Sequence, residues 1–525
     1  MSHILEITLC FVFLFNYLEI LYYLQIKEFR IDRLSGFIST EDGKKKIKKI
    51  ALEILKTTIF YFLALSFQKV FQKKELLIIL LTLFIFFFLL EISKKVSQKK
   101  LKRPKITLKI LMIFVLYSAF SFLAYFKREF IFPIFFPVEC IFLFMLSILL
   151  TELFSLAVKK AIVCIVKLKI LPLKKNLTVI GITGSYGKST TKEFLFHLLS
   201  KNFKTLKTSN NVNTEIGVAL IVLRNLKKEH EIFIVEMGAY KKGEIKKICD
   251  IVQPNFGIIT GIEKQHLSLF GNLENIIKTK FELFESVKEK TNLLFNLDSR
   301  FSENFLEKNK SKQFKTYSFL TSKADYFCEV LEYNFRKIKF KINDDTFFLE
   351  NFPIFNLSNL IPAILIAKKL GIESEKIKIL LKNLPEINST FQIFEKENVV
   401  IIDDSYNSNV NIFYEICKIA GFFKEYKKIL FTPGVFELGT ESQKIHEEIG
   451  KELSSSFDEI IVTIDEKFHF FTNKLQEQEK KKFKKMLEKI NLGEVFKAEK
   501  IFLILEGRVP VSLKKEIFDI LNIKK

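Results

Sequence analysis

Paired cysteines are missing from this sequence. The six cysteines stand far apart, and no two of them form a CxxC pair. The sequence therefore predicts neither a disulfide framework nor a zinc site, and it fits a reducing compartment. A cleavable signal peptide is also not expected, because no basic segment or small-residue cleavage site frames the first apolar stretch. The cysteines are Cys10, Cys140, Cys164, Cys249, Cys328 and Cys417.

Acidic residues are scarce relative to basic ones. The 525 residues include 82 Lys and Arg against 59 Asp and Glu, a formal net charge of +23. Such a charge can indicate nucleic-acid binding, but its distribution disfavours that class. Residues 1–175 hold 28 basic and 12 acidic residues, or +16, whereas residues 176–525 hold 54 and 47, or +7. The excess flanks apolar segments, so we expect a bilayer as partner and no nucleic acid.

Long apolar stretches fill the first third of the chain. About 20 apolar residues span a bilayer core of roughly 30 Å. The third stretch, ELLIILLTLFIFFFLLEI, is the clearest, whereas lysines interrupt the second and two prolines interrupt the fifth. We predict four to five membrane spans, followed by a surface helix or linker over 152–172. The stretches lie near 4–24, 51–71, 76–92, 108–126 and 130–150.

Basic loops predict the orientation of these spans. Lysine and arginine collect after the first, third and fifth stretches, with eight between Lys27 and Lys49 and seven between Lys94 and Lys105. Basic loops stay on the cytoplasmic side. We therefore expect a multi-pass protein of the cytoplasmic (inner) membrane, with its N-terminus outside and the remaining two thirds of the chain in the cytoplasm.

A phosphate-binding loop follows the apolar first third of the chain. Residues 178–191, TVIGITGSYGKSTT, combine a buried strand, a glycine-rich turn and the start of a helix. Backbone N–H groups and a helix N-terminus in such a loop bind phosphate. The lysine would reach the β- and γ-phosphates, and the serine hydroxyl would ligate Mg²⁺. No second signature of the LSGGQ type is present, which disfavours an ATP-driven pump. The nucleotide-binding candidates are Gly184, Ser185, Gly187, Lys188, Ser189 and Thr190.

Strands and helices alternate after this loop. Apolar strands at 232–235, 254–261 and 293–300 end in polar residues, which predicts a mostly parallel, doubly wound sheet with its ligand at the strand C-termini. Glu236 ends the first of these strands and is either a Mg²⁺ ligand or a solvent-facing carboxylate. His266 and Lys280 follow the second, where a lone histidine is usually structural and a lone helical lysine usually solvated.

The fold class that we predict has three parts. Residues 1–172 form an α-helical membrane domain with a surface helix or linker, and residues 173–388 an α/β P-loop ATP-binding domain. Residues 389–525 form a smaller, Rossmann-like α/β domain. Within the second domain, residues 301–352 alternate polar and apolar residues and suggest an antiparallel insertion.

Seven or eight ordered motifs between about 178 and 450 resemble the Mur ligase family, and are closest to its members that add D-alanyl-D-alanine in peptidoglycan synthesis. They are GITGSYGKST, NNVNTEIG, FIVEMGAYKKGEI, QHLSLFG, KTKFELF, NLD, DDSYNSN and TPGVFELG. The resemblance implies an ATP-dependent acid–amino-acid ligase. It would join D-Ala-D-Ala to a muramoyl tripeptide through an acyl phosphate, with ATP and two Mg²⁺ ions.

The resemblance also implies a role for individual residues. Lys188 and Ser189 would bind the ATP phosphates and Mg²⁺, and Glu236 and His266 would ligate metal. Lys280 matches a family lysine that is carbamylated and supports a second Mg²⁺ ion. Asn296 resembles the adenine contact. The loop of the last domain that closes over nucleotide and substrate would contain Asp404, Tyr406, Asn407 and Asn409.

Two departures from the family keep alternatives open. Thr390 stands where the family places an arginine, which raises the alternative of a weakened nucleotide-binding scaffold for other cell-wall enzymes. Apolar segments also replace the family's uridine-nucleotide domain, so the acceptor is either a soluble uridine nucleotide or a lipid-linked form, and the spans either deliver it or only tether the enzyme. The sequence leaves the amine donor and the oligomeric state open.

Overall fold

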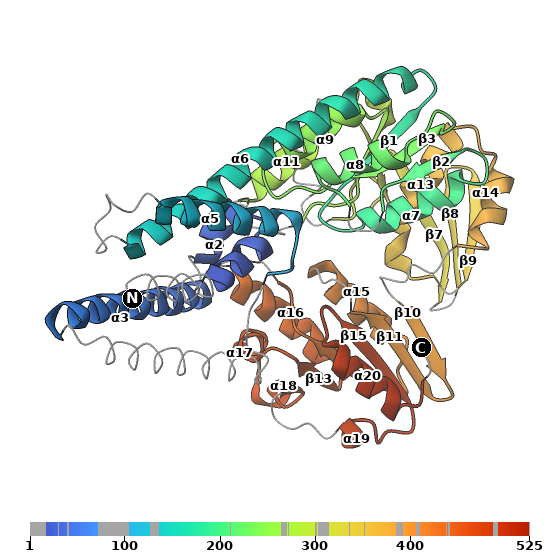
Figure 1. The fold of residues 1–525 in the computed structure, drawn as a ribbon. Coiled ribbons are helices and arrows are strands. Elements are labelled where there is room, and N and C mark those ends of the chain that lie inside the picture. Colours follow the sequence, from blue (N-terminus) through green and yellow to red (C-terminus); the bar gives the residue numbers. More distant parts are fainter. Residues whose placement is uncertain are drawn as a thin grey trace. The chain divides into compact units, whose positions relative to one another are not determined.

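The computed structural model shows two compact units, Met1–Ala161 and Ile162–Lys525 (Figure 1). The structure describes residues 17–29, 31–38, 41–71, 104–126, 136–209, 212–263, 270, 272–299, 302, 314–334, 337–350, 352–384, 392–405, 410–436, 438, 441–486 and 492–523.

Helices make up the described part of the first unit. A small core gathers around Tyr17, Tyr61, Tyr117 and Phe144, in which the rings of Tyr17 and Phe144 stack with their centroids 4.0 Å apart. Many large apolar side chains of α5 and α6 are exposed instead of buried. Residues 17–26 are helical, and the helices that follow are α2 (Ile31–Ile38), α3 (Glu41–Phe71), α5 (Leu108–Phe126) and α6 (Phe136–Ile170).

The prediction of five membrane spans is not supported by the described residues. Among them, only Val138–Leu173 is long and apolar enough to cross a membrane, as judged by length and composition, and Leu108–Leu123 is a shorter apolar helix. The predicted span 51–71 lies within α3, which does not meet that criterion. The predicted span 76–92 and most of 4–24 lie outside the described residues.

A single long helix replaces two predicted elements. Residues 136–150 of the fifth predicted span and residues 152–170 of the predicted surface helix form one continuous helix, α6. No proline or glycine interrupts residues 138–170, so nothing in the backbone ends the helix before Pro172. The last turns of α6 belong to the second unit, where Val166 and Ile170 are buried in a hydrophobic core.

A nine-stranded sheet forms the first half of the second unit, in the order β2-β3-β1-β4-β5-β6-β7-β8-β9. Strands β2 to β7 pair in parallel, as the sequence predicts. The strands are β1 (Thr178–Thr183), β2 (Thr205–Lys207), β3 (Ile232–Glu236), β4 (Phe256–Ile259), β5 (Leu293–Asn296), β6 (Lys315–Ser318), β7 (Tyr326–Asn334), β8 (Lys337–Ile342) and β9 (Asp345–Glu350).

Helices cover both faces of this sheet, as expected for a doubly wound fold. One apolar core joins the sheet to α7, α13 and α14, and the other joins it to the end of α6 and to α8, α9 and α11. The helices are α7 (Lys188–Leu199), α8 (Glu215–Asn225), α9 (Glu244–Val252), α11 (Leu273–Ser286), α13 (Leu357–Lys369) and α14 (Ser374–Leu381), with short 3₁₀ turns at Leu171–Leu173, Lys290–Asn292 and Ile354–Asn356.

The predicted antiparallel insertion is an extension of the main sheet. Strands β7, β8 and β9 pair in antiparallel fashion, while β7 also pairs with β6 in parallel. Alternate residues Ile338, Phe340 and Ile342 of β8 point into the core under α13, which explains the alternating pattern FRKIKFKI.

A six-stranded sheet follows, in the order β10-β11-β15-β12-β13-β14, with only β10 antiparallel. The basic run KKKFKK contains the edge strand β14, in which Phe483 is buried beside β13. The strands are β10 (Gln392–Lys396), β11 (Val399–Asp404), β12 (Lys427–Thr432), β13 (Glu459–Val462), β14 (Phe483–Lys485) and β15 (Ile501–Glu506). The helices are α15 (Val410–Ala420), α16 (Ser442–Ser456), α17 (Asp465–Thr472), α18 (Glu477–Lys480), α19 (Leu492–Val495) and α20 (Val511–Ile520).

Candidate active site

A glycine turn connects β1 to α7 at the predicted phosphate loop. Gly187 caps α7 in the left-handed conformation, with φ of +76°. A Cβ at this position would lie 2.1 Å from Asn359 Oδ1, and one at Gly184 would lie 2.0 Å from Thr260 Oγ1. Both positions therefore require glycine, because the turn has a positive φ and a close approach at each of them. The turn leaves the first N–H groups of α7 available to an anion.

Lys188 opens α7 and folds back over the turn. Its Nζ donates to the carbonyl oxygens of Gly184 at 2.8 Å and Ser185 at 3.4 Å. Burial lowers the pKa of Lys188, and the negative charge of Glu236 partly opposes this. The ammonium group is thus held at the phosphate loop by backbone carbonyls, where it can neutralise phosphate charge.

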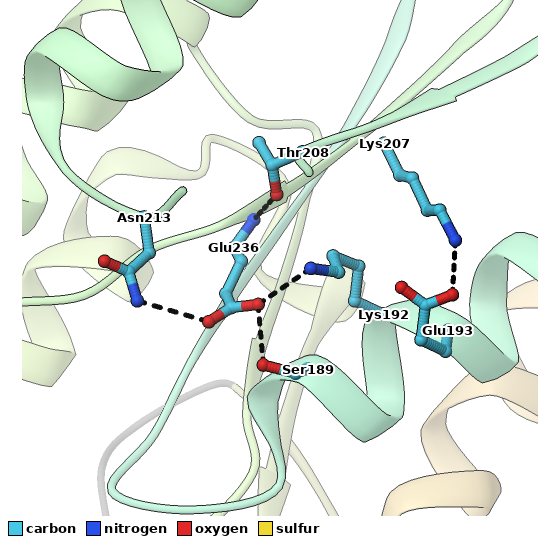
Figure 2. A network of polar contacts seen from close by, with 7 residues as sticks. All are labelled: Ser189, Lys192, Glu193, Lys207, Thr208, Asn213 and Glu236. Atoms are coloured by element: carbon cyan, nitrogen blue, oxygen red, sulfur yellow. Dashed lines mark hydrogen bonds and ion pairs between the residues drawn. The ribbon is translucent and has the colours of Figure 1, made fainter. Parts of the chain in front are cut away.

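Glu236 is the centre of a buried hydrogen-bond network (Figure 2). Strand β3 pairs with β1 so that Glu236 lies opposite Ile182, beside the phosphate loop. Its Oε2 accepts from Ser189 Oγ at 2.9 Å and Lys192 Nζ at 3.0 Å, and its Oε1 accepts from Asn213 Nδ2 at 3.2 Å. Thr208 Oγ1 accepts from the Glu236 backbone N–H at 3.1 Å. Figure 2 shows the side chains of Ser189, Lys192 and Asn213 converging on this carboxylate. Glu236 is 2% exposed, so the solvent-facing alternative for it is wrong.

The charge state of Glu236 follows from this network. Burial alone would raise its pKa, but the neighbouring charges of Lys188 and Lys192, with hydrogen bonds from Lys192 and Ser189, lower the pKa below its usual value. The side chain is therefore a carboxylate at neutral pH.

The oxygen atoms at the end of β3 fit Mg²⁺. A serine hydroxyl and a carboxylate in contact are hard oxygen ligands, which Mg²⁺ prefers. Over the described ranges, no group of three or more His, Cys, Asp or Glu side chains converges. Mg²⁺ is commonly held by one or two protein oxygens together with phosphates and water, so Ser189 and Glu236 are a suitable protein share.

Lys280 is buried on α11, with only 5% of its surface exposed. Among the residues that the structure describes, its Nζ has no hydrogen-bond or ion-pair partner. Burial and the like charge of Lys188 lower the pKa of Lys280 well below its usual value. The solvated alternative for this lysine is wrong. His266 lies outside the described residues.

Asn296 ends β5 and is fully buried. Its Nδ2 donates to the Thr260 carbonyl at 2.7 Å, and its Oδ1 accepts from the Asp298 N–H at 2.9 Å. The side chain thus joins the C-terminal ends of β4 and β5, which is the edge where ligands bind in this class of sheet. Its contact with adenine stays a prediction.

The predicted closing loop begins at the end of β11. Asp404 is buried there, in register with Glu506 of β15. The preceding Asp403 accepts from Ser405 Oγ at 2.5 Å and forms an ion pair with Lys514. Tyr406, Asn407 and Asn409, together with Thr390, lie outside the described residues.

Three residues of the site were missed by sequence reasoning. Lys192 follows Ser189 by one helical turn, so helical spacing could have placed it toward Glu236. Asn213 belongs to the NNVNTEIG motif, to which the sequence analysis assigns no contact with Glu236. Asn359 on α13 accepts from Thr191 Oγ1 at 3.4 Å and packs against Gly187, but nothing in an apolar helix sequence separates this asparagine from a structural one.

Known proteins share these motifs and this fold. Residues 182–367 match the model of the Mur ligase middle domain. The UDP-N-acetylmuramoyl-tripeptide–D-alanyl-D-alanine ligase of Buchnera aphidicola (strain APS) is 31% identical over 365 residues, which are 67% of this chain and 78% of that protein. Those of Escherichia coli and Bacillus subtilis are 26% and 30% identical, over 65% and 60% of their lengths and 55% and 53% of this chain.

Solved structures agree with this relationship. MurF from Acinetobacter baumannii superposes with a TM-score of 0.59 at 25% identity, over 69% of this chain and 80% of that one. MurF from Thermotoga maritima, solved in complex with ADP, has the same fold, with a TM-score of 0.56 at 24% identity over 69% and 83%.

Fold and site together define a P-loop enzyme with two α/β domains and a carboxylate beside its phosphate loop. The chain belongs to the Mur ligase family. It is therefore an ATP-dependent amide ligase, a class that uses ATP and Mg²⁺.

Proposed function

We propose that this chain adds D-alanyl-D-alanine to a muramoyl tripeptide during peptidoglycan precursor synthesis. The observation that carries the proposal is the contact of Ser189 with Glu236 at a phosphate loop, in a chain 31% identical to a ligase of that name. The two residues meet across 47 positions of sequence, which supports a site that folding assembles.

The reaction divides into two transfers. A carboxylate oxygen of the tripeptide attacks the γ-phosphorus of ATP, the bond to the β,γ-bridging oxygen breaks, and ADP leaves. The amine of the donor then attacks the acyl carbon, phosphate leaves, and the amine loses its proton. Lys188 and the N–H groups of α7 stabilise the phosphate charge that builds up in the first transfer. Ser189 and Glu236 would hold Mg²⁺, which would supply further neutralisation of the phosphate charge when bound.

The buried Lys280 suits carbamylation. Only a neutral amine attacks CO₂, and burial together with the charge of Lys188 favours the neutral form of this lysine. The carbamate formed would carry a negative charge close to Lys188 and could serve a second Mg²⁺ ion. With His266, it would complete the metal site that the family resemblance implies.

Further site residues belong to this proposal. Asn296 would contact adenine, and the loop after Asp404, with Tyr406, Asn407 and Asn409, would close over the nucleotide and exclude water from the acyl phosphate.

We further propose that the first unit attaches the enzyme to the cytoplasmic membrane, with the ligase in the cytoplasm. The support is α6, whose exposed apolar side chains include Phe142, Leu149 and Leu153. The exposed lysines 159, 160 and 167 follow this apolar part, where anionic lipid head groups would attract them. A membrane-attached ligase could take a lipid-linked acceptor in place of a soluble uridine nucleotide.

Acceptor-dependent phosphate release tests the proposed function. The full chain in detergent is incubated with ATP, Mg²⁺ and D-Ala-D-Ala, with or without the UDP-linked or the lipid-linked muramoyl tripeptide. A ligase releases phosphate only when an acceptor is present, and the Lys188→Ala variant should release about 100-fold less or lower still. Nucleotide binding without acceptor-dependent turnover would instead favour the scaffold alternative.

A further inference from the structure

Lys192 is the most deeply buried cation of the second unit's described part. Its side chain is 0% exposed, and it forms an ion pair with Glu236, whose side chain is 3% exposed. Burying an ammonium group is unfavourable unless a partner compensates its charge. The neighbouring pair of Glu193 and Lys207 is partly exposed and does not touch Glu236 (Figure 2). A solvent-exposed ion pair such as that of Glu193 and Lys207 therefore does not explain why Lys192 is buried against Glu236.

The position of Lys192 bears directly on metal binding. Its Nζ donates to Oε2 of Glu236, the same oxygen that accepts from Ser189. Asn213 donates to the other carboxylate oxygen. A divalent cation bound by Ser189 and Glu236 would therefore share a carboxylate with a fixed ammonium group. Charges of one sign at such short range repel strongly in a buried site.

A triphosphate changes this balance. The nucleotide carries several negative charges to the N-terminus of α7, where Lys188 and Lys192 are one turn apart. Each of these cations attracts the phosphates, and the phosphates in turn attract the metal. The fixed charge of Lys192 thus opposes a metal ion that arrives alone and favours one that arrives with a triphosphate.

We propose that Lys192 is a positioning residue that couples metal binding to nucleotide binding. It holds the Glu236 carboxylate in place and keeps the affinity for a lone divalent cation low, so that the site fills only with metal and triphosphate together. This inference rests on the proposed function, because it assumes that the phosphate loop binds ATP with Mg²⁺.

Manganese binding tests the coupling without any catalytic readout. Mn²⁺ affinity is measured by electron paramagnetic resonance on the full chain, with and without a non-hydrolysable ATP analogue. In the wild type, the analogue should increase Mn²⁺ affinity at least tenfold. Lys192→Gln keeps a hydrogen-bond donor but removes the charge, and should bind Mn²⁺ alone on the order of tenfold more tightly. Lys207→Gln, which removes the neighbouring cation, should behave as the wild type.

The outcomes distinguish a failure of the coupling by Lys192 from a failure of the proposed ligase function. Equal Mn²⁺ affinity of Lys192→Gln and wild type without nucleotide would overturn the coupling, as would a wild type whose affinity ignores the analogue. If Lys192→Gln does not fold, Lys192→Met is measured in its place. The Mn²⁺ affinity of the wild type with and without the analogue also tests the coupling by itself. A wild type that binds neither the analogue nor Mn²⁺ in its presence would instead refute the proposed function.

Discussion

At the scale of single residues, Gly187 determines whether α7 can begin where the phosphate loop ends. Its φ is +76°, and a Cβ there would lie 2.1 Å from Asn359 Oδ1. We predict that Gly187→Ala destabilises the fold by about 2 kcal/mol or more and lowers turnover at least tenfold, since both backbone strain and the collision displace the turn. Chemical unfolding and the phosphate-release assay measure the two effects.

Gly371 provides the matched control. Its φ is +88°, but a Cβ at that position would meet nothing within 4 Å. Gly371→Ala should therefore show only the strain of a positive φ, about 1 kcal/mol, with unchanged turnover. Equal losses in the two variants would show that the contact with Asn359 is unimportant.

Lys280 yields a prediction about carbon dioxide. If the buried neutral amine forms a carbamate, activity should fall severalfold in CO₂-depleted buffer and return when bicarbonate is added. Lys280→Ala should lose nearly all activity and regain part of it with short carboxylates, which can occupy the place of the carbamate. Activity that is indifferent to bicarbonate would contradict carbamylation, and Lys278→Ala, on the exposed side of α11, controls for effects on the helix.

His446 should make the stability of the six-stranded-sheet part of the second unit depend on pH. The ring is fully buried on α16, where Nδ1 lies 2.6 Å from the Ser442 carbonyl and Nε2 accepts from the Val435 N–H at 3.1 Å. This arrangement needs the neutral ring. Burial lowers the pKa of His446 to about 4 from its ordinary 6.5, outweighing the hydrogen bond to Ser442, and the charge of Lys467 adds to the effect.

The sign of the pH effect follows from proton uptake. Between pH 6.5 and about 4 the unfolded chain binds a proton at His446 that the folded chain does not, so stability is complete above pH 6.5 and falls as pH drops through this window. The expected loss is about 3 kcal/mol. The free energy of unfolding should depend less on pH in this range for His446→Gln than for the wild type. His469→Gln, which alters an exposed ring, should keep the wild-type pH dependence.

At the scale of elements, the end of α6 is fastened to the C-terminus of α8. Lys169 Nζ donates to the carbonyl oxygens of Val222 and Leu223, each at 2.8 Å, while Val166 and Ile170 are buried beside them. A cation at a helix C-terminus satisfies carbonyl groups that the helix leaves without partners. The N-terminus of α8 follows Asn213, so this helix runs from the Glu236 network to α6.

Removing this cation should loosen α8. We predict that Lys169→Ala lowers the free energy of unfolding by about 1.5–3 kcal/mol, the range for hydrogen bonds of a charged group. The exposed Lys167 on the same helix is the control, and Lys167→Ala should change stability by less than about 0.5 kcal/mol. Similar melting curves for both variants would mean that Lys169 contributes only as a solvated charge.

At the scale of the whole molecule, the full chain should sediment with membranes and resist carbonate extraction. A fragment of residues 162–525 should remain in the supernatant, since it leaves out most of the exposed apolar side chains of α6 but retains Val166 and Ile170 in the core. A full chain released by carbonate would remove the proposed membrane attachment, while leaving the ligase chemistry untouched.

The sequence by itself determined the elements around the phosphate loop. Residues 178–191 and the strand before Glu236 have local patterns that predict a strand, a turn and a helix. Lys188 and Ser189 begin α7 and Glu236 ends β3, as these patterns predict, because each residue is fixed to the end of its own element. The same local reasoning predicted too many spans in the first third of the chain, because a long apolar stretch favours a span wherever it occurs. It could not show that residues 136–170 form one helix.

Only the tertiary structure decided which partners these residues have. The ion pair of Lys192 with Glu236 and the contact of Asn359 with Gly187 join residues 44 and 172 positions apart, and no local pattern encodes such distances. Burial likewise gave Lys280 its lowered pKa and His446 its neutral ring, although the sequence showed only a helical lysine and a lone histidine. Side-chain charge depends on the dielectric and the neighbours that folding creates, and these belong to the packed chain as a whole.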